Sequence, residues 1–415
     1  MRALFILLAS LLAVACSPSA PASPTAAPAK PTSAPAAAGS PAAAKPAASP
    51  GAAASPAASP AASPAAEAGG SGGALPNIPQ PARGGPLPSQ ADVDTVINGY
   101  YQKAKAAGET NLVIYGGLAE DWNDVIAEFR KKYPDMSMEK VNLRGPEMLQ
   151  RLAAEKASGK QVANMVTHGQ TTMSTFDKGG DMTEWEGPPT APYIPPAGLT
   201  EGKTRWSHSF SLFSGVANTD LVPAARIPTK RTDLLDPFFK GRGKLLLEDP
   251  RAGGPGLDVG TVNYVQLGDK WLEDLKAQDP TFVRDRDNAP TQVARGEYAV
   301  FYPVSITTEL LELERAAPVK VFYLTDGGTT IQESTIGIVK GAPGQDAAKM
   351  FISWLISPDG QKVVVEKRNV YSVLPGYPPP AGQPPLEEVN PSKRTDDQIA
   401  RNNEFIDIFD KAFFR

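Results

Sequence analysis

Two glycine turns could bind an anion through their backbone amides. The run "NLVIYGG" ends at Gly116 and Gly117, and "LLLEDPRAGGPG" places Gly253 and Gly254 after a second apolar run. Glycine turns and helix N-termini present N–H groups to anions. Arg251, two residues before the second glycine pair, could add a guanidinium that pairs with a carboxylate or phosphonate. We therefore predict that both turns contact a small anion, and we expect Arg251→Ala to weaken binding with little effect on melting.

Two further turns follow other predicted strands. Arg144 follows the run "MSMEKVNL", and Gly169, Gln170 and Thr171 follow "VANMVTH". A planar guanidinium pairs bidentately with a carboxylate, and the polar triplet leads into a predicted helix. We include these four residues in the same predicted binding site.

The run "EYAVFYPVS" predicts another buried strand with a polar end. We predict that Tyr302 and Ser305 contact the solute and that Phe301 belongs to the core. His168 ends a strand at the predicted rim, and His208 is placed in a polar loop. Their sequence context gives no metal-ligand spacing, so we interpret them as polar filling or lining of the cleft.

Alternating strands and helices would position these turns. A leading helix is expected at 93–108 and a buried strand at 111–115. The next helix carries four apolar residues with the spacing of one helical face, which are Trp122, Val125, Ile126 and Phe129. Strand–helix alternation with short connections predicts an α/β fold with doubly wound sheets. Ligands bind beyond the C-terminal strand ends of such sheets, so the turns should converge on one rim.

Composition excludes several classes of function. The chain has 41 Lys and Arg against 45 Asp and Glu, without basic blocks that would indicate nucleic acid. It contains no G-x-S-x-G or H-E-x-x-H motif, and its single cysteine is Cys16. We predict that the protein is not an enzyme and uses no cofactor and no metal.

The N-terminal part is typical of an exported protein. Residues 1–15 combine a basic start with an apolar run, which indicates a signal peptide. Cys16 follows small residues as in a bacterial lipobox, although Ala13 stands where leucine is usual. Residues 16–90 are nearly all Ala, Pro, Ser and Gly and predict a disordered tether. We expect lipidation of Cys16 and anchoring at the outer face of the cell membrane.

Several motifs, taken in order, resemble one family. These are "LVIYGGLAEDWNDVIAEFRKKYP", "NTDL", "LEDPRAGGPG", "STIGIVKGAP" and "FISWLISPDGQK". Together they resemble bacterial extracellular solute-binding proteins of ABC importers, in the ferric-iron and thiamine-type subgroup of the type 2 periplasmic-binding fold. The resemblance covers roughly residues 110–376.

The resemblance implies two lobes that close on a solute and then dock on a permease. By this resemblance, chain crossings lie near 213–217 and 333–338. Lobe 1 would hold 91–213 plus 334–365, and lobe 2 would hold 216–330 plus 366–415. We expect a monomer that captures a small anionic organic solute.

Two alternatives share this fold. One is a ferric-iron-binding transport protein, and the other is the ligand-sensing component of a receptor. The resemblance places the subgroup's iron ligands at Ala119, Gly169, Val304 and Ser305. Hard Fe(III) needs anionic oxygen ligands, which these residues lack. Tyr302 lies two residues before Val304, the first of the two positions where the subgroup has its tyrosine pair.

Overall fold

The structure, a computed structural model, describes residues 86–194 and 203–415. The predicted signal peptide, Cys16 and almost all of the predicted tether lie outside the described residues. Within the described ranges, no helix combines the length and the apolar character needed to cross a membrane.

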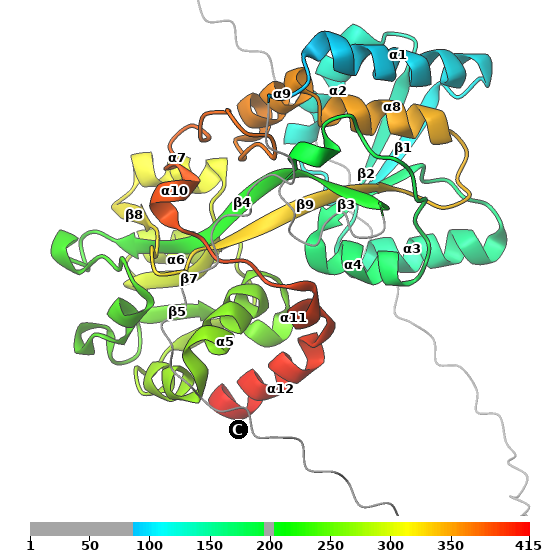
Figure 1. Ribbon diagram of the computed structural model, residues 1–415. Helices are drawn as coiled ribbons and strands as arrows, with labels where there is room; N and C mark the ends of the chain where they lie inside the picture. The colour runs from blue at the N-terminus through cyan, green and yellow to red at the C-terminus, as the bar shows by residue number, and fades with distance from the viewer. Residues whose placement is uncertain (1–85, 195–202) are drawn as a thin grey trace, which may run out of the picture. The chain divides into compact units, whose positions relative to one another are not determined.

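Nine strands of the described residues form one mixed sheet (Figure 1). The strands are β1 (Asn111–Gly116), β2 (Ser137–Asn142), β3 (Met165–Gly169), β4 (Arg205–Asn218), β5 (Leu245–Glu248), β6 (Thr281–Val283), β7 (Val300–Ser305), β8 (Val319–Phe322) and β9 (Thr330–Ile338). Their order is β2-β1-β3-β9-β4-β7-β5-β6, and β8 pairs with β4.

Two groups of parallel strands lie at opposite ends of this sheet. β1 pairs in parallel with β2 and β3, and β5 pairs in parallel with β6 and β7. β4 and β9 lie between them as a long antiparallel pair from Arg205↔Gly337 to Phe213↔Thr330, with a shift of register between Ser207 and Ser209. The predicted α/β fold with two lobes joined by crossing strands is confirmed. The residues expected at the crossings lie within β4 and β9, and the exact lobe boundaries stay a prediction.

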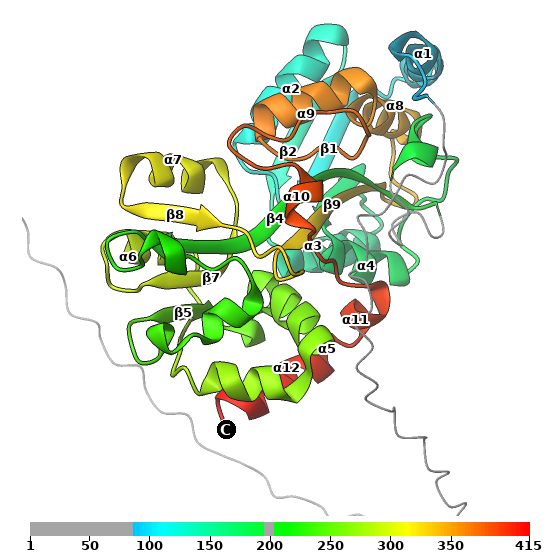
Figure 2. The same cartoon turned by 60° about the vertical axis from the view of Figure 1, so that its left-hand side comes forward.

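Helices cover both ends of the sheet (Figures 1 and 2). They are α1 (Gln90–Ala106), α2 (Asp121–Lys132), α3 (Gly145–Ser158), α4 (Gln170–Lys178), α5 (Gly254–Lys276), α6 (Ala289–Ala294), α7 (Thr308–Ala316), α8 (Gln345–Leu355), α9 (Pro358–Arg368), α10 (Leu386–Val389), α11 (Asp396–Ala400) and α12 (Asn402–Phe413). Short 3-10 turns are η1 (Ala191–Tyr193), η2 (Ala224–Arg226), η3 (Arg231–Leu235), η4 (Pro237–Phe239) and η5 (Pro250–Ala252). We call β1–β3 with α1–α4, α8 and α9 the first lobe, and β5–β8 with α5–α7 the second lobe.

Apolar periodicity explains the packing of the first lobe. The four predicted apolar residues of α2 are all buried, and they fix the helix against the sheet. Trp354 of α8 stacks near Phe129, with their ring centroids 5.1 Å apart. Burying large side chains of this kind stabilises a fold by about 2 to 3 kcal/mol each. The buried cluster continues past β4 as far as Phe301, which places that residue in the core as expected.

The C-terminal residues run across the middle of the sheet before reaching the second lobe. Tyr371 exchanges two backbone hydrogen bonds with Phe210 of β4, and Ser392 forms a bridge with Thr330 of β9. Only then does α12 pack on α5, where Phe405 and Phe409 join the core of the second lobe. The C-terminal residues therefore contact the strands that connect the two lobes.

Candidate functional site

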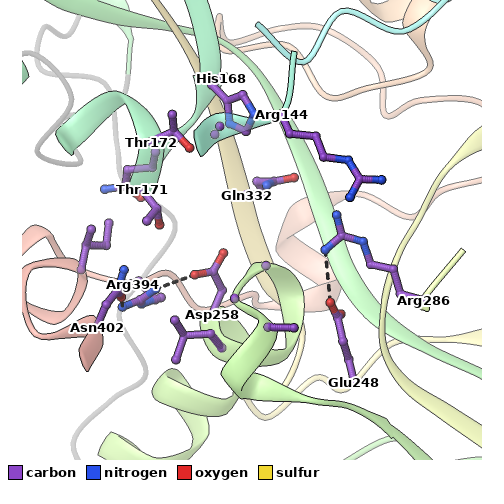
Figure 3. Close-up of a pocket in the computed structure, with 18 of the residues that line it drawn as sticks. Arg144, His168, Thr171, Thr172, Glu248, Asp258, Arg286, Gln332, Arg394 and Asn402 are labelled. Atoms are coloured by element: carbon purple, nitrogen blue, oxygen red, sulfur yellow. Dashed lines mark hydrogen bonds and ion pairs between the residues drawn. The ribbon is translucent and has the colours of Figure 1, made fainter. Parts of the chain in front are cut away.

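One cavity of about 910 Å³ lies where both lobes, β9 and the C-terminal residues meet. The first lobe contributes the starts of α3 and α4. The second lobe contributes η5, the start of α5 and the residues after β6. Figure 3 shows side chains from these elements pointing toward the same space.

Seven of the eleven predicted contact residues line this cavity. They are Arg144, Gly169, Gln170, Thr171, Arg251, Gly253 and Gly254. The other four, Gly116, Gly117, Tyr302 and Ser305, are not among its lining residues. The cavity lining therefore includes the predicted turns after β2, β3 and β5, but neither the turn after β1 nor the predicted residues of β7.

The turn after β1 is occupied by its own chain. Gly117 donates its N–H to the carbonyl of Thr167, and Leu143 donates to the carbonyl of Gly116 at 2.7 Å. The N–H of Leu118 is bound by the side-chain oxygen of Asn142 at 2.9 Å. These backbone groups have protein partners, which explains why this turn does not open on the cavity.

Tyr302 and Ser305 lie away from the cavity for different reasons. The Tyr302 hydroxyl donates to the carbonyl of Gly328 at 2.6 Å and accepts from Asn263 at 3.0 Å. Burial raises the pKa of this phenol, so Tyr302 is a neutral core residue. Ser305 ends β7, where it pairs with Phe213 of β4.

Three helix N-termini face the cavity, and their own N-cap residues supply no side-chain cap. In α5 the N–H of Gly256 is bound by the carboxylate of Glu248 at 3.2 Å, and Pro255 has no N–H. α3 (14 residues), α4 (9 residues) and α5 (23 residues) begin directly after Arg144, Gly169 and Gly253. None of these three N-cap residues has a side-chain oxygen that could accept a hydrogen bond from the first-turn amides. Unsatisfied amides and the helix dipole favour negative charge at such ends. The backbone therefore gives this cavity a positive potential.

Arg251 is held by acidic residues of its own lobe. Its guanidinium binds Asp249 at 2.9 Å and Asp410 at 3.1 Å, and it lies 3.3 Å from the centroid of the Phe414 ring. Asp249 also binds Arg284 at 2.9 Å. Arg251 thus lines the cavity as a neutralised, stacked side chain, and these contacts argue against the expectation that its removal would hardly affect melting.

Arg144 and Arg286 are exposed cations of the lining, and Figure 3 shows their side chains pointing toward the same place from the two lobes. Arg286 binds Glu248 at 3.1 Å, whereas Arg144 has no ion pair with any described residue. The side chain of Glu248 is 2% exposed. Burial raises its pKa to about 7, although Arg286 opposes the shift. Glu248 therefore carries less negative charge near neutral pH than an ordinary glutamate.

The two histidines differ in their surroundings. His168 lines the cavity, and burial lowers the pKa of its imidazole. His208 was expected in a polar loop, but it is a buried residue of β4. It shares a hydrogen bond of 2.8 Å with Thr167, and its ring lies 5.4 Å from that of Trp122. Both histidines are thus neutral polar groups, His168 as part of the lining and His208 as part of the core.

Several lining residues were not predicted from the sequence. They are Asp258, Arg286, Gln332, Arg394 and Asn402, among others. The charged runs "VRDRDN" and "SKRTDDQ" contain two of them, but charge alone more often indicates a solvated surface. Only the packing of the C-terminal residues brings Arg394 to α5.

The described residues contain no group of three or more His, Cys, Asp and Glu side chains placed to hold a metal ion. The lining residues that the structure describes also include no tyrosine. An Fe(III) site would have to draw its anionic oxygen ligands from another source, such as a bound anion.

The fold and cavity agree with the family comparison. Residues 115–362 match the family described as bacterial extracellular solute-binding protein, and the chain belongs to that family. The motifs suggested the ferric-iron and thiamine-type branch of this family. The similar proteins described next include two that are named or described for iron, in agreement with that branch.

Two curated relatives match part of the chain. Iron uptake protein A2 of Synechocystis is 29% identical over 164 residues, covering 35% of this chain and 46% of the relative. An uncharacterized protein of Haemophilus influenzae is 25% identical over 184 residues, covering 41% of this chain and 52% of that protein. The chain thus spans about half the length of the curated relatives it matches.

Solved structures show the same fold at low identity. Iron-bound HitA from Pseudomonas aeruginosa has a TM-score of 0.63 at 15% identity, covering 73% of this chain and 99% of HitA. The periplasmic binding protein AfuA from Actinobacillus pleuropneumoniae, with fructose-6-phosphate bound, has a TM-score of 0.57 at 18% identity, covering 73% and 98%. These likenesses show a type 2 periplasmic-binding fold and no ligand.

Proposed function

We propose that this protein captures a small anionic organic solute in the cavity and delivers it to the permease of an ABC importer. The observation that supports this most directly is the convergence on one cavity of three helix N-termini whose N-cap residues supply no side-chain cap. Arg144, a cation with no acidic partner in the described residues, lies at the same place.

The arrangement of charges, rather than their sum, favours an anion. The lining contains five arginines and five acidic residues. Most of the acidic groups are engaged, because Glu248 binds Arg286, Asp258 binds Arg394 and Glu333 binds Lys393. An anion placed between Arg144 and the helix N-termini would meet donors without displacing an existing ion pair.

Closure of the lobes would link binding to transport. Arg144 and the first turns of α3 and α4 belong to the first lobe, and Arg286 and the start of α5 belong to the second. A solute that contacts both groups stabilises the closed form by its extra affinity for that form. The paired strands β4 and β9 would carry the bending.

We further propose an extracytoplasmic location with a lipid anchor. The family is one of extracellular proteins, and the sequence of residues 1–90 supports export, lipidation of Cys16 and a tether. In this proposal the partners are a permease and the membrane beneath it, and the protein acts as a monomer. A sensing role on the same fold would use the same closure.

Ferric iron is the second candidate. A relative named iron uptake protein A2 and the iron-bound structure of HitA favour it. The described lining, with no tyrosine and no acidic triad, favours an organic anion instead. A ferric ion would need a chelating anion to supply oxygen ligands.

Isothermal titration calorimetry of the purified protein tests the proposal. The panel is succinate, D-gluconate, 2-aminoethylphosphonate and ferric citrate. We expect at least one organic anion to bind and Arg144→Ala to weaken that binding more than tenfold. Arg130→Ala, at an exposed position of α2 outside the cavity lining, is the matched control and should leave affinity unchanged. Binding of ferric citrate alone would favour the iron alternative, and no organic-anion binding would overturn the proposal.

A further inference from the structure

The C-terminal residues form one wall of the cavity. Arg394, Ile399, Asn402, Asn403 and Ile406 all line it, and we call residues 394–406 the C-terminal wall. This wall reaches the cavity after crossing β9, and α12 then fixes it to α5. The aliphatic residues would limit the width of a solute, while the polar residues can bind it.

Arg394 is fixed in place by three partners. Its side chain is only 4% exposed. One terminal nitrogen donates to Asp258 Oδ1 at 2.5 Å, and the other donates to the carbonyl of Gln398 at 2.8 Å and to the side chain of Asn402. Its Nε is buried without a hydrogen-bond partner in the described part of the chain. Arg394 therefore holds the carboxylate of Asp258 in one orientation through its bond to Oδ1.

Asp258 presents one free carboxylate oxygen to the cavity. Its side chain lines the cavity and is 23% exposed. Oδ1 accepts from Arg394, whereas Oδ2 accepts no hydrogen bond from any described residue. Figure 3 shows the carboxylate on α5, below Thr171 and Thr172 of α4, with Arg394 on one side. This oxygen is open to the cavity. A solute that displaces water from it should supply a donor, because an acceptor that loses its hydrogen-bond partner on desolvation is unfavourable.

The chemistry around Asp258 favours a hydroxyl as this donor. Arg394 already balances the charge of Asp258, so an ammonium group would meet little net negative charge. Hydroxyl groups both donate and accept hydrogen bonds. They therefore match the nearby hydroxyl of Thr171 and the amides of Gln332 and Asn402.

The lining also disfavours flat aromatic solutes. Among the described residues that line the cavity there is no Phe, Tyr or Trp. A heteroaromatic solute would find only the imidazole of His168 as an aromatic ring in the described lining, although stacking on larger rings is a common way to hold such groups. An aliphatic solute with several polar groups fits this lining better.

We infer that the solute is an aliphatic anion carrying a hydroxyl group, with Asp258 and the C-terminal wall as the subsite for that hydroxyl. This inference rests on the proposed function, which places the anionic group near Arg144 and the helix N-termini. Arg394 acts as a positioning residue that holds Asp258 toward the solute. The class includes hydroxy acids and phosphorylated polyols, which share this chemistry.

Matched probes test the inference on the wild-type protein by calorimetry. The first pair is D-gluconate and hexanoate, and the second is glycerol 3-phosphate and propyl phosphate. Members of a pair share the anionic group and differ in hydroxyl groups. We expect the hydroxylated member of at least one pair to bind at least tenfold more tightly.

Variants assign the preference to Asp258. Asp258→Asn places an amide donor where the free acceptor was, so it should remove most of the tenfold preference. Asp287→Asn is the matched control, since Asp287 lines the same cavity with a side chain that is 86% exposed. The control should keep the preference.

The possible results separate this inference from the proposed function. Equal affinity within both pairs would overturn the hydroxyl subsite and leave anion capture standing. Failure of all four probes and of the wider anion panel would overturn anion capture itself. A preference that survives in folded Asp258→Asn would remove Asp258 from the subsite, and if that variant fails to fold, the wild-type comparison still decides the solute class.

Discussion

The turn after β1 and the turn before α5 both contain a glycine pair, but only the second lines the cavity. In the first, the carbonyl of Gly116 and the N–H of Gly117 are both bound by neighbouring backbone. In the second, Gly254 begins α5, so its N–H has no partner within the helix. A glycine pair therefore indicates a tight turn, and its availability to a ligand depends on what neighbouring strands donate to it.

The two turns also differ in how they are stabilised. The first depends on close backbone contact with β3 and on Asn142 of β2. The second turn is stabilised by the carboxylate of Glu248. This carboxylate accepts a hydrogen bond from the N–H of Gly256 and forms an ion pair with Arg286. At the first turn, mutations should therefore act mainly through steric clashes with β3. At the second turn, stability should depend mainly on the ionisation state of Glu248.

The largest effect is expected for Gly116→Ala. A Cβ at Gly116 would overlap the carbonyl of Thr167. We expect a loss of about 3 kcal/mol or more in the free energy of unfolding, measured by urea denaturation. Gly253→Ala is the comparison, since its Cβ would meet no atom within 4 Å and only its φ of +78° is unfavourable. Gly253→Ala should lose about 1 to 2 kcal/mol. Equal losses in Gly116→Ala and Gly253→Ala would show that close contact with β3 does not distinguish the first turn from the second.

The next effect concerns pH at the second turn. The pKa of Glu248 is raised from 4.5 to about 7, so the native state binds a proton that the unfolded state has lost between these values. This contribution to stability is present below about pH 4.5 and disappears as the pH rises toward 7. Its upper bound is about 3 kcal/mol.

Glu248→Gln cannot titrate and isolates this contribution. The stability of the wild type relative to Glu248→Gln should decrease between pH 5 and pH 7.5, as measured by urea unfolding at each pH. Because Glu333, whose pKa is also raised to about 7, is present in both proteins, it does not contribute to the difference. A difference independent of pH would contradict the assignment.

A moderate effect is expected at Arg251. Arg251→Ala removes two ion pairs and a stacked ring contact, and it should lower the free energy of unfolding by about 1 to 2 kcal/mol. Arg144→Ala has no ion pair to lose and should change stability by less than about 0.5 kcal/mol. Chemical denaturation of both variants without ligand measures the two losses. A larger loss for Arg144→Ala than for Arg251→Ala would show that Arg144, and not Arg251, is the arginine that stabilises the fold.

A smaller loss than at Arg251 is expected at Asn142. Asn142→Ala removes one of the two acceptors for the N–H of Leu118, since the carbonyl of Gly116 also accepts from it at 3.0 Å. The loss should be about 1 kcal/mol. Asn142→Asp keeps an acceptor oxygen and should retain most of the stability. If the two variants unfold at the same denaturant concentration, the side-chain oxygen does not close the first turn.

Sequence patterns predicted the α/β fold and the cavity-lining turns after β2, β3 and β5. Apolar spacing predicted the buried face of α2, because one helical face must pack against the sheet. It did not predict the C-terminal wall. An amphipathic pattern in α12 indicates that a face is buried, but it does not identify the partner, which here is α5.

The sequence alone determined the order of strands and helices, the glycine positions and the family. These properties follow from local periodicity and from motifs read along the chain. Tertiary structure decided that Gly116 is enclosed, that Arg251 is neutralised, and that Arg394 meets Asp258 136 residues away. The physical reason is that hydrogen-bond and ion-pair partners are set by packing between distant segments, and one-dimensional spacing does not specify which segments pack together.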